Sequence, residues 1–241
     1  MVQGKLEMKH FIFDVDGTLT PSRQNINSEF KIFFNEFCRT HKVSLVTGSD
    51  KPKTIEQIGE DTYNMCHTVF NCNGSDVWQS KKNIYTDDWT LPEDVHEWLS
   101  GFLTESKFVL RTGLHFDHRP GMCNFSIVGR NATLGERMLY AKFDKENNER
   151  NTIAKMLNER FKYVEAKVGG ETGIDISKKH SDKSQILKYF DIKEELHFFG
   201  DAMHKEGNDY PLKKVILDKG RGFCYNIQDY KETWNILKDY D

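Results

Sequence analysis

The first 70 residues alternate apolar runs with amphipathic segments, and this alternation constrains the fold more than any other feature of the chain. Three short apolar runs are typical of buried strands, and the two segments between them carry apolar residues at helical spacing. We predict strands at residues 9–15, 43–47 and 67–70, and helices at residues 28–41 and 51–65. Strand, helix, strand, helix, strand is the order of a parallel sheet covered by helices.

The end of the chain, from residue 181, repeats this pattern. We predict a helix at residues 181–190, strands at 195–200 and 213–218, and a closing helix at 230–240. Because both ends of the chain have this character, we expect them to build one α/β layer. The prediction is a discontinuous domain of residues 1–83 and 179–241 with a Rossmann-like parallel sheet.

The middle of the chain has a different pattern. A helix at residues 92–105 precedes short strand-like segments, a long charged helix at 134–161, and two further strands. The strand-like segments are 107–118, 122–129, 163–170 and 172–177. Their short connections favour an antiparallel sheet with helices on one face. We therefore predict an α+β cap domain, residues 84–178, inserted into the α/β core.

Composition excludes several classes of protein. The 34 basic and 37 acidic residues give a net charge of −3, which predicts no nucleic-acid partner. Apolar runs are too short to span a membrane, and the first ten residues lack a secretory signal, so we expect a cytoplasmic protein without a membrane partner. The five scattered cysteines form no CxxC pair, which argues against a disulfide framework or a zinc site.

Carboxylates gather where the predicted strands end. Asp14 and Asp16 close the first strand, and Asp201 and Asp209 follow the strand at 195–200. Because the functional crevice of an open parallel sheet lies beyond the carboxyl ends of its strands, these groups are expected to converge. A single Asp-x-Asp is often only a helix cap or a turn. A cluster is costly without a cation, and hard oxygen ligands favour Mg²⁺.

The stretches DVDGT, LVTG, the lysine at 183, and GD followed by GND resemble the four motifs of the haloacid dehalogenase superfamily of phosphoryl-transfer enzymes. The resemblance implies that Asp14 is the nucleophile and Asp16 the general acid and base. It also implies a Mg²⁺ ion held by Asp14, Asp201 and the backbone carbonyl of Asp16, with Asp209 as a ligand or an anchor for its waters. Thr47 and Lys183 would bind the phosphoryl oxygens. Taken alone, Lys183 would more often be a solvated helix lysine.

Sequence motifs in the inserted unit point to one family within this superfamily. RPGMCNFSIVGRNATLGER and GGETGIDIS, with TPSRQ after the first motif, are similar to the eukaryotic-type phosphomannomutases, which have a type IIB cap. Three arginines can grip a phosphate dianion through paired N–H donors, although a lone surface arginine is usually only solvated. The resemblance implies that a substrate phosphate is bound by Arg119, Arg130 and Arg137. It implies further substrate contacts by Arg23, Met122, Asn124, Gly170 and Asp175. Asp175 alone could equally satisfy a turn.

The function implied by the resemblance is interconversion of mannose 1-phosphate and mannose 6-phosphate, with glucose phosphates as further substrates. The reaction would use an aspartyl-phosphate on Asp14 and a hexose 1,6-bisphosphate activator. Two alternatives remain open: a sugar-phosphate phosphatase with the same fold, and a non-catalytic sugar-phosphate-binding protein. Family members commonly form homodimers through the cap. Candidates for that contact are Trp89, Trp98, Phe102 and Leu103, although such residues more often serve in ordinary core packing.

Several positions depart from the family pattern. Ala202 stands where the family usually has lysine, and Glu206 replaces a glycine of the fourth motif. Gly173 stands where the family has a serine, which removes one hydroxyl donor to phosphate. Thr47 supplies a hydroxyl where the mutases often have glycine. These departures bear on metal affinity and sugar specificity and leave the phosphoryl-transfer motifs unchanged.

Overall fold

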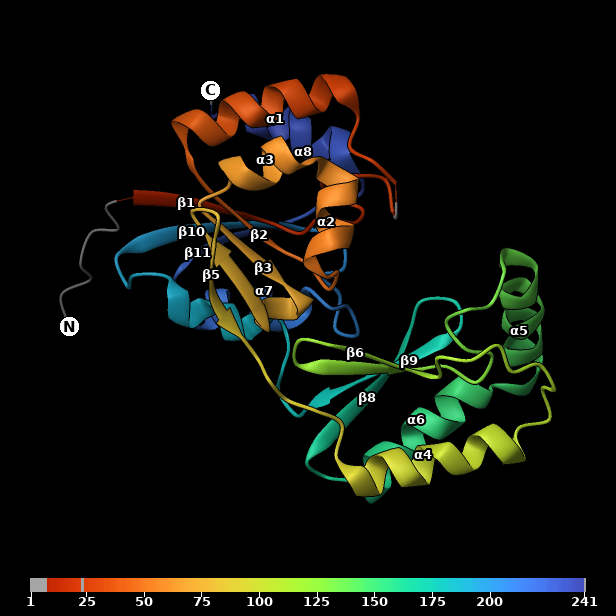
Figure 1. Cartoon of the computed structure of the whole chain (residues 1–241). Helices are drawn as coiled ribbons and strands as arrows, with labels where there is room; N and C mark the ends of the chain where they lie inside the picture. The colour runs from red at the N-terminus through yellow and green to blue at the C-terminus, as the bar shows by residue number, and fades with distance from the viewer. Residues whose placement is uncertain (1–7, 23, 241) are drawn as a thin grey trace. The chain divides into compact units, whose positions relative to one another are not determined.

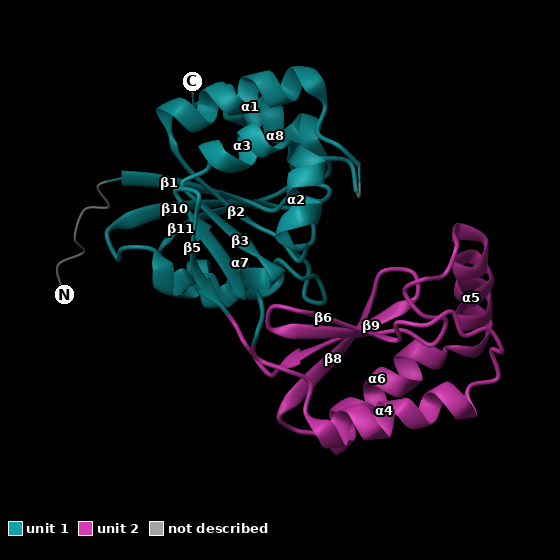
Figure 2. Ribbon diagram, viewed as in Figure 1, with its two compact units in different colours: residues 1–86, 181–241 teal, residues 87–180 magenta. Residues whose placement is uncertain are grey.

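A computed structural model describes residues 8–22 and 24–240 of the chain. The chain divides into two compact units (Figure 2). The first unit comprises residues 1–86 and 181–241, and the second comprises residues 87–180. The sequence had placed these boundaries at 84 and 178.

The first unit is built on a sheet of seven strands in the order β11-β10-β1-β2-β3-β4-β5. The five strands from β11 to β3 are parallel, and an antiparallel hairpin, β4–β5, extends one edge. The strands are β1 (Met8–Phe13), β2 (Lys42–Val46), β3 (Thr68–Asn71), β4 (Asp76–Gln79), β5 (Lys82–Thr86), β10 (Glu194–Gly200) and β11 (Gly222–Asn226). The predicted Rossmann-like core is confirmed, whereas the hairpin was not predicted.

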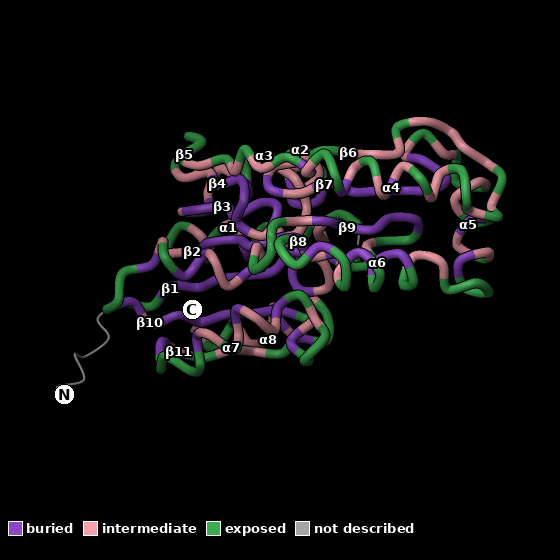
Figure 3. Tube along the Cα trace, turned by 90° about the horizontal axis from the view of Figure 1, so that it is seen from below, coloured by how far each residue is buried: buried purple, intermediate pink, exposed green. Residues whose placement is uncertain are grey.

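Helices cover both faces of this sheet, as the alternation along β1 requires (Figure 1). Phe11 and Phe13 pack into one apolar cluster, and Ile12 between them packs into another on the opposite face. The first face is covered by α1 (Ser28–Thr40), α2 (Lys51–Ile58), α3 (Glu60–Met65) and α8 (Tyr230–Leu237). The second is covered by the 3₁₀ helix η2 (Lys183–Tyr189) and by α7 (Tyr210–Asp218). The central strands are accordingly buried along most of their length (Figure 3).

Local sequence explains where α1 begins and which side it buries. The side chain of Asn27 accepts hydrogen bonds from the amides of Glu29 and Phe30, both at 3.1 Å, and so caps the first turn. Phe30, Phe34 and Phe37 follow at helical spacing and are fully buried. Helix α1 therefore packs its aromatic stripe onto the sheet.

Two predicted elements of the first unit differ in the structure. The single helix predicted at 51–65 is two helices, because Gly59 adopts φ 84° between them. The strand predicted at 213–218 is wrong, since these residues lie in α7. Pro211 occupies the first turn of this helix, and Leu212 and Ile216 are buried one turn apart. The strand of this region is β11, which follows the helix.

The second unit is a four-stranded antiparallel sheet in the order β6-β7-β9-β8, with helices packed on one face (Figure 1). Its elements are α4 (Glu93–Glu105), β6 (Phe116–Arg119), β7 (Met122–Phe125), α5 (Leu134–Asn147), α6 (Glu149–Arg160), β8 (Val164–Gly169) and β9 (Gly173–Lys178). This confirms the predicted α+β architecture. The long helix predicted at 134–161 is interrupted by Asn148, which adopts φ 54°. The strand predicted from residue 107 begins only at Phe116.

Across residues 8–22 and 24–240, none of the helices combines the length and apolar character that crossing a membrane requires.

A buried polar cluster lies near the start of β1. Nε2 of His10 lies 2.8 Å from Oγ of Ser44, and Nδ1 lies 3.4 Å from Oε1 of Glu194, which also accepts a 2.5 Å hydrogen bond from Lys42. Burial lowers the pKa of His10 from 6.5 to about 4, and Lys42 acts in the same direction, whereas Glu194 opposes it. The imidazole is therefore neutral in the folded protein at pH values where the unfolded chain takes up a proton.

We expect the free energy of unfolding to fall as the pH decreases from about 6.5 toward 4. Between pH 7 and pH 5, His10 should account for a loss of about 2 kcal/mol, at about 1.4 kcal/mol per pH unit. Urea denaturation of the wild type and His10→Asn at both pH values measures this loss. His180→Asn, which changes an exposed histidine, is the matched control. An equal loss in all three proteins would contradict the assignment.

Candidate active site

Three neighbouring strands of the first unit end in residues that the sequence singled out. Strand β1 pairs with β10 on one side and β2 on the other, and all three run parallel. Asp14 follows β1, Thr47 follows β2, and Asp201 follows β10. The amide of Asp14 still donates to the carbonyl of Phe199 at 2.9 Å, so the first carboxylate is fixed to the sheet edge. The carboxyl ends of parallel strands are where such folds place their crevice.

Lys183 is a buried cation between two carboxylates. Its Nζ donates to Oδ1 of Asp14 at 2.5 Å and to Oδ1 of Asp209 at 2.6 Å, and the side chain is 0% exposed. Burial lowers the pKa of Lys183, but the two carboxylates outweigh it, so the net pKa is raised. The lysine is therefore protonated and is not the solvated helix lysine that its sequence position alone would suggest.

The carboxylates near Lys183 carry more negative charge than its single positive charge can neutralise. One oxygen each from Asp14, Asp201 and Asp209 lies within 4.8 Å of the others. Burial raises the pKa of Asp14 to about 8, and the negative charges of Asp209 and Asp201 act in the same direction against Lys183. A divalent cation among these oxygens would offset their repulsion. The all-oxygen donor set fits Mg²⁺.

Two glycines make room for this cluster. A Cβ atom at Gly17, which adopts φ 78°, would lie 2.2 Å from Oδ2 of Asp201. A Cβ atom at Gly200 would lie 2.5 Å from Oδ2 of Asp209. Any side chain at either position would therefore displace a carboxylate.

Asp209 is anchored through the backbone of Ala202. The amide of Ala202 donates to Oδ2 of Asp209 at 3.0 Å, and the amide of Asp209 donates to the carbonyl of Ala202 at 3.2 Å. Because both contacts use the main chain of Ala202, the replacement of the family's lysine leaves them unchanged. Glu206, the other departure in this loop, is exposed.

The hydroxyl of Thr47 has a proton to donate. Its Oγ1 accepts a 3.1 Å hydrogen bond from the amide of Ser49, and the side chain is almost fully buried. The carbonyl of Thr47 accepts from the amide of Asn73 at 2.8 Å, which ties the loop after β3 to the loop after β2. A hydroxyl held in this way can donate to an anion beyond the sheet edge.

Asp16 has a partner that the sequence did not predict. Nε2 of Gln57, in the last turn of α2, donates to Oδ1 of Asp16 at 2.8 Å. No motif surrounds Gln57, and the two residues are 41 positions apart, so only the fold brings them together.

In the second unit, the polar site residues share one face of the sheet. Cys123 and Phe125 of β7 pack against the helices, so Met122 and Asn124 point to the opposite face. The same alternation puts Asp175 of β9 there, because Ile174 and Ile176 enter the helical core. Asp117 and Arg119 of β6 also alternate with Phe116, which packs with that core.

Each of the three arginines pairs with an acidic side chain. Arg119 donates to Oδ2 of Asp117 at 2.7 Å, and Nε of Arg130 lies 3.4 Å from the same oxygen. Arg137 lies 3.4 Å from Oε2 of Glu171. Burial lowers the pKa of Arg130, and the positive charges of Arg119 and Arg137 act in the same direction, against the charge of Asp117. An arriving phosphate dianion would offset this repulsion. Asp117 was not predicted, although its spacing from Arg119 along one strand places both on the same face.

Asn124 and Asp175 form a pair over two glycines. Nδ2 of Asn124 donates to Oδ1 of Asp175 at 2.6 Å. A Cβ atom at Gly173 would lie 2.3 Å from Nδ2 of Asn124, and one at Gly169 would lie 2.0 Å from Oδ2 of Asp175. The absence of the family's serine at 173 thus leaves the space that the Asn124 amide occupies.

The remaining predicted residues lie as follows. Met122 of β7 pairs with Arg119 of β6, next to the turn that joins these two strands. Gly170 lies in the turn between β8 and β9, and its carbonyl accepts a 2.9 Å hydrogen bond from Arg150. Arg23 lies outside the described residues.

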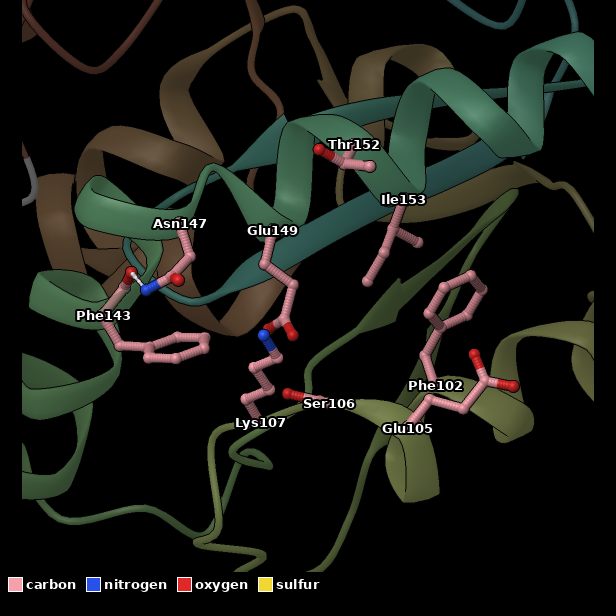
Figure 4. Close-up of a pocket in the computed structure, with 9 residues that line it drawn as sticks. All are labelled: Phe102, Glu105, Ser106, Lys107, Phe143, Asn147, Glu149, Thr152 and Ile153. Carbon is pink, nitrogen blue, oxygen red and sulfur yellow. Dashed lines mark hydrogen bonds between the residues drawn. The ribbon is translucent and has the colours of Figure 1, made fainter.

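A pocket of about 330 Å³ opens on the helical side of the second unit (Figure 4). It is lined by Phe102, Glu105, Ser106, Lys107, Phe143, Asn147, Glu149, Thr152 and Ile153. None of the predicted site residues lines it, and Asn124 and Asp175 lie on the opposite face of the sheet.

Solved structures share this fold. A haloacid dehalogenase-like hydrolase from Bacteroides thetaiotaomicron matches with a TM-score of 0.65 at 14% identity, over 98% of this chain and 100% of that one. A sugar phosphatase of subclass IIB matches with a TM-score of 0.59 at 16% identity, over 96% and 98%. The chain therefore has the fold of these haloacid dehalogenase-like proteins, as the motifs predicted.

Sequence comparison specifies the family. The profile of the eukaryotic phosphomannomutases matches residues 30–240. The phosphomannomutase of Glycine max is 32% identical over 209 residues, which is 83% of this chain and 85% of that protein. The phosphomannomutase of Solanum lycopersicum is 32% identical over 231 residues, 92% and 90% of the two chains. The chain belongs to the eukaryotic phosphomannomutase family, which confirms the predicted resemblance.

Proposed function

We propose that this protein is a phosphomannomutase that interconverts mannose 1-phosphate and mannose 6-phosphate, and also acts on glucose phosphates. A hexose 1,6-bisphosphate serves as activator, and the enzyme is Mg²⁺-dependent. Its membership of the eukaryotic phosphomannomutase family supports the reaction.

The observation that supports the proposal is a group of arginines in the second unit, which does not include the carboxylates of the first. Arg119 and Arg130 both pair with Asp117 on the polar face of the sheet, and Arg137 belongs to the same unit. Asp14 and Lys183 belong to the first unit. A mutase needs a nucleophile for one phosphate and a grip for the other. Asn124 and Asp175, on the same face as the arginines, are assigned to the sugar and its phosphate.

The chemical step uses the side chains of the first unit. An oxygen of Asp14 attacks the phosphorus of the bisphosphate, the bond from phosphorus to the sugar oxygen breaks, and Asp16 gives that oxygen a proton. Thr47 and Lys183 bind the phosphoryl oxygens. A hexose monophosphate then presents its free hydroxyl, which gives its proton to Asp16 as it takes the phosphoryl group from Asp14. The bisphosphate that forms reorients and gives its other phosphoryl group to Asp14, which releases the isomeric monophosphate. Arg23 and the backbone of Gly170, together with Met122, complete the substrate contacts.

Asp14, Asp201, Asp209 and the backbone carbonyl of Asp16 are the residues proposed to hold Mg²⁺. When bound, the ion neutralises phosphoryl and carboxylate charge. The close approach of the three carboxylate oxygens supports this assignment.

We also propose that the protein is cytoplasmic and forms a homodimer through the second unit. Trp89, Trp98, Phe102 and Leu103 are half-buried against the core of that unit, so only their exposed parts are available to a partner. Light scattering of the purified chain measures the oligomeric state, and a monomeric mass at all concentrations would refute the dimer.

The function is tested by incubating the purified protein with Mg²⁺, mannose 1-phosphate and a hexose 1,6-bisphosphate. Phosphorus NMR is expected to record conversion to mannose 6-phosphate until both monophosphates reach equilibrium. Omitting the bisphosphate should slow the reaction, because Asp14 then has no phosphoryl donor other than the substrate. Chelating the metal should stop it.

The alternatives give different spectra. Free phosphate without mannose 6-phosphate would overturn the mutase proposal in favour of a phosphatase, in which water takes the phosphoryl group from Asp14. Binding of the sugar phosphate without any turnover would indicate a non-catalytic sugar-phosphate-binding protein.

A further inference from the structure

Gln57 holds the carboxyl group of Asp16 from inside the protein. Its Nε2 donates to Oδ1 of Asp16 at 2.8 Å and lies 3.5 Å from Oγ1 of Thr20. The Gln57 side chain is only 1% exposed. Its carbonyl also accepts a 2.8 Å hydrogen bond from the amide of Ile26, so main chain and side chain are both fixed. An ionised carboxylate only accepts hydrogen bonds, which agrees with an amide nitrogen facing it.

Packing alone does not account for this amide. Oε1 of Gln57 is buried and has no hydrogen-bond partner among the described residues. Leaving a buried acceptor without a partner lowers stability, whereas a methionine of similar size would fill the same space without that cost. The contact with Asp16 is what glutamine provides and methionine does not.

We propose that Gln57 is a positioning residue that orients Asp16 for proton transfer; this inference rests on the proposed function of Asp16. When Asp14 attacks phosphorus and the bond to the leaving oxygen breaks, the proton on the Asp16 carboxyl passes to that oxygen. In the return step, the hydroxyl of the acceptor gives its proton to Asp16 as its oxygen attacks phosphorus. Gln57 keeps its own protons and fixes the plane of the carboxyl group, so that the proton lies on the line of transfer.

The test is the dependence of rate on the leaving group. Para-nitrophenolate leaves with little help from an acid, phenolate needs more, and a sugar alkoxide needs the most. For Gln57→Met, we expect the ratio of kcat/KM for phenyl phosphate to kcat/KM for para-nitrophenyl phosphate to fall about tenfold. The ratio of mannose 1-phosphate to para-nitrophenyl phosphate should fall further, by about 100-fold. A role in folding alone would lower all three rates together and leave both ratios unchanged.

Two further variants sharpen the result. Gln185→Met removes another partly buried amide of the first unit, which donates to the carbonyl of Asn73 at 2.8 Å and does not contact Asp16, so its ratios should equal those of the wild type. In Asp16→Asn, adding Gln57→Met should lower the ratios no further, because the group that Gln57 orients is then absent.

Each outcome decides the proposal. Unchanged ratios in Gln57→Met, or an equal fall in Gln185→Met, would overturn it. A further fall in the double variant would also overturn it. If the wild type cleaves aryl phosphates but does not isomerise mannose 1-phosphate, the proposed function fails while the aryl series still decides the role of Gln57. A wild type that turns over none of these esters would refute both.

Discussion

Replacing Asp14 by asparagine is expected to lower turnover of mannose 1-phosphate by more than about 10⁴-fold. An amide is a poor nucleophile and cannot form the acyl phosphate that divides the transfer into two steps. Asp14 is 4% exposed and its side chain contacts Lys183. Because asparagine has nearly the same shape, the site should keep its geometry. Turnover is measured by coupled assay or phosphorus NMR, and mass spectrometry after incubation with the bisphosphate should detect no phosphorylated protein.

Binding should survive this change. The arginines of the second unit are untouched, so mannose 1-phosphate should still raise the melting temperature of Asp14→Asn. Asp218→Asn, which changes an exposed aspartate of α7, is the matched control and should turn over at the wild-type rate. Retained turnover in Asp14→Asn would refute its role as nucleophile. Loss of turnover together with loss of ligand stabilisation would instead indicate that the substitution damaged the site as a whole.

Replacing Lys183 by methionine is expected to abolish turnover and to lower the free energy of unfolding by about 3–5 kcal/mol. The lysine is fully buried between Asp14 and Asp209, and its removal leaves two carboxylates close together without their cation. Urea denaturation at neutral pH measures the loss. Mg²⁺ should restore more stability to the variant than to the wild type, because an ion at the carboxylates replaces part of the missing charge.

Lys188→Met is the matched control for this experiment. Lys188 lies in the same 3₁₀ helix, is exposed, and contacts the rings of Tyr85 and Tyr189. Its loss should cost less than about 1 kcal/mol. Sodium chloride at matched ionic strength separates a specific effect of Mg²⁺ from general screening. Equal destabilisation by the two substitutions would contradict the structural role of Lys183.

Sequence patterns predicted the parts of the fold that depend on long, regular periodicity. The apolar run of β1 and the aromatic stripe of α1 each carry enough repeats to indicate one structure. The strand prediction for residues 213–218 was wrong because a short apolar run is as typical of a buried helix as of a buried strand. The breaks at Gly59 and Asn148 were missed because a left-handed residue interrupts a helix without changing the spacing of its apolar residues.

The sequence by itself determined which residues carry charge at the strand ends and in the arginine motifs, because motif spacing is a local property of the chain. The sequence also predicted that the carboxylates of Asp14, Asp201 and Asp209 lie close together, since the carboxyl ends of parallel strands meet at one edge of the sheet. Only the tertiary structure decided which group each of them contacts. Gln57 donates a hydrogen bond to Asp16. Asp117 pairs with both Arg119 and Arg130. Gly173 leaves space for the side chain of Asn124. These contacts depend on distances between separate elements, and local sequence does not encode those distances.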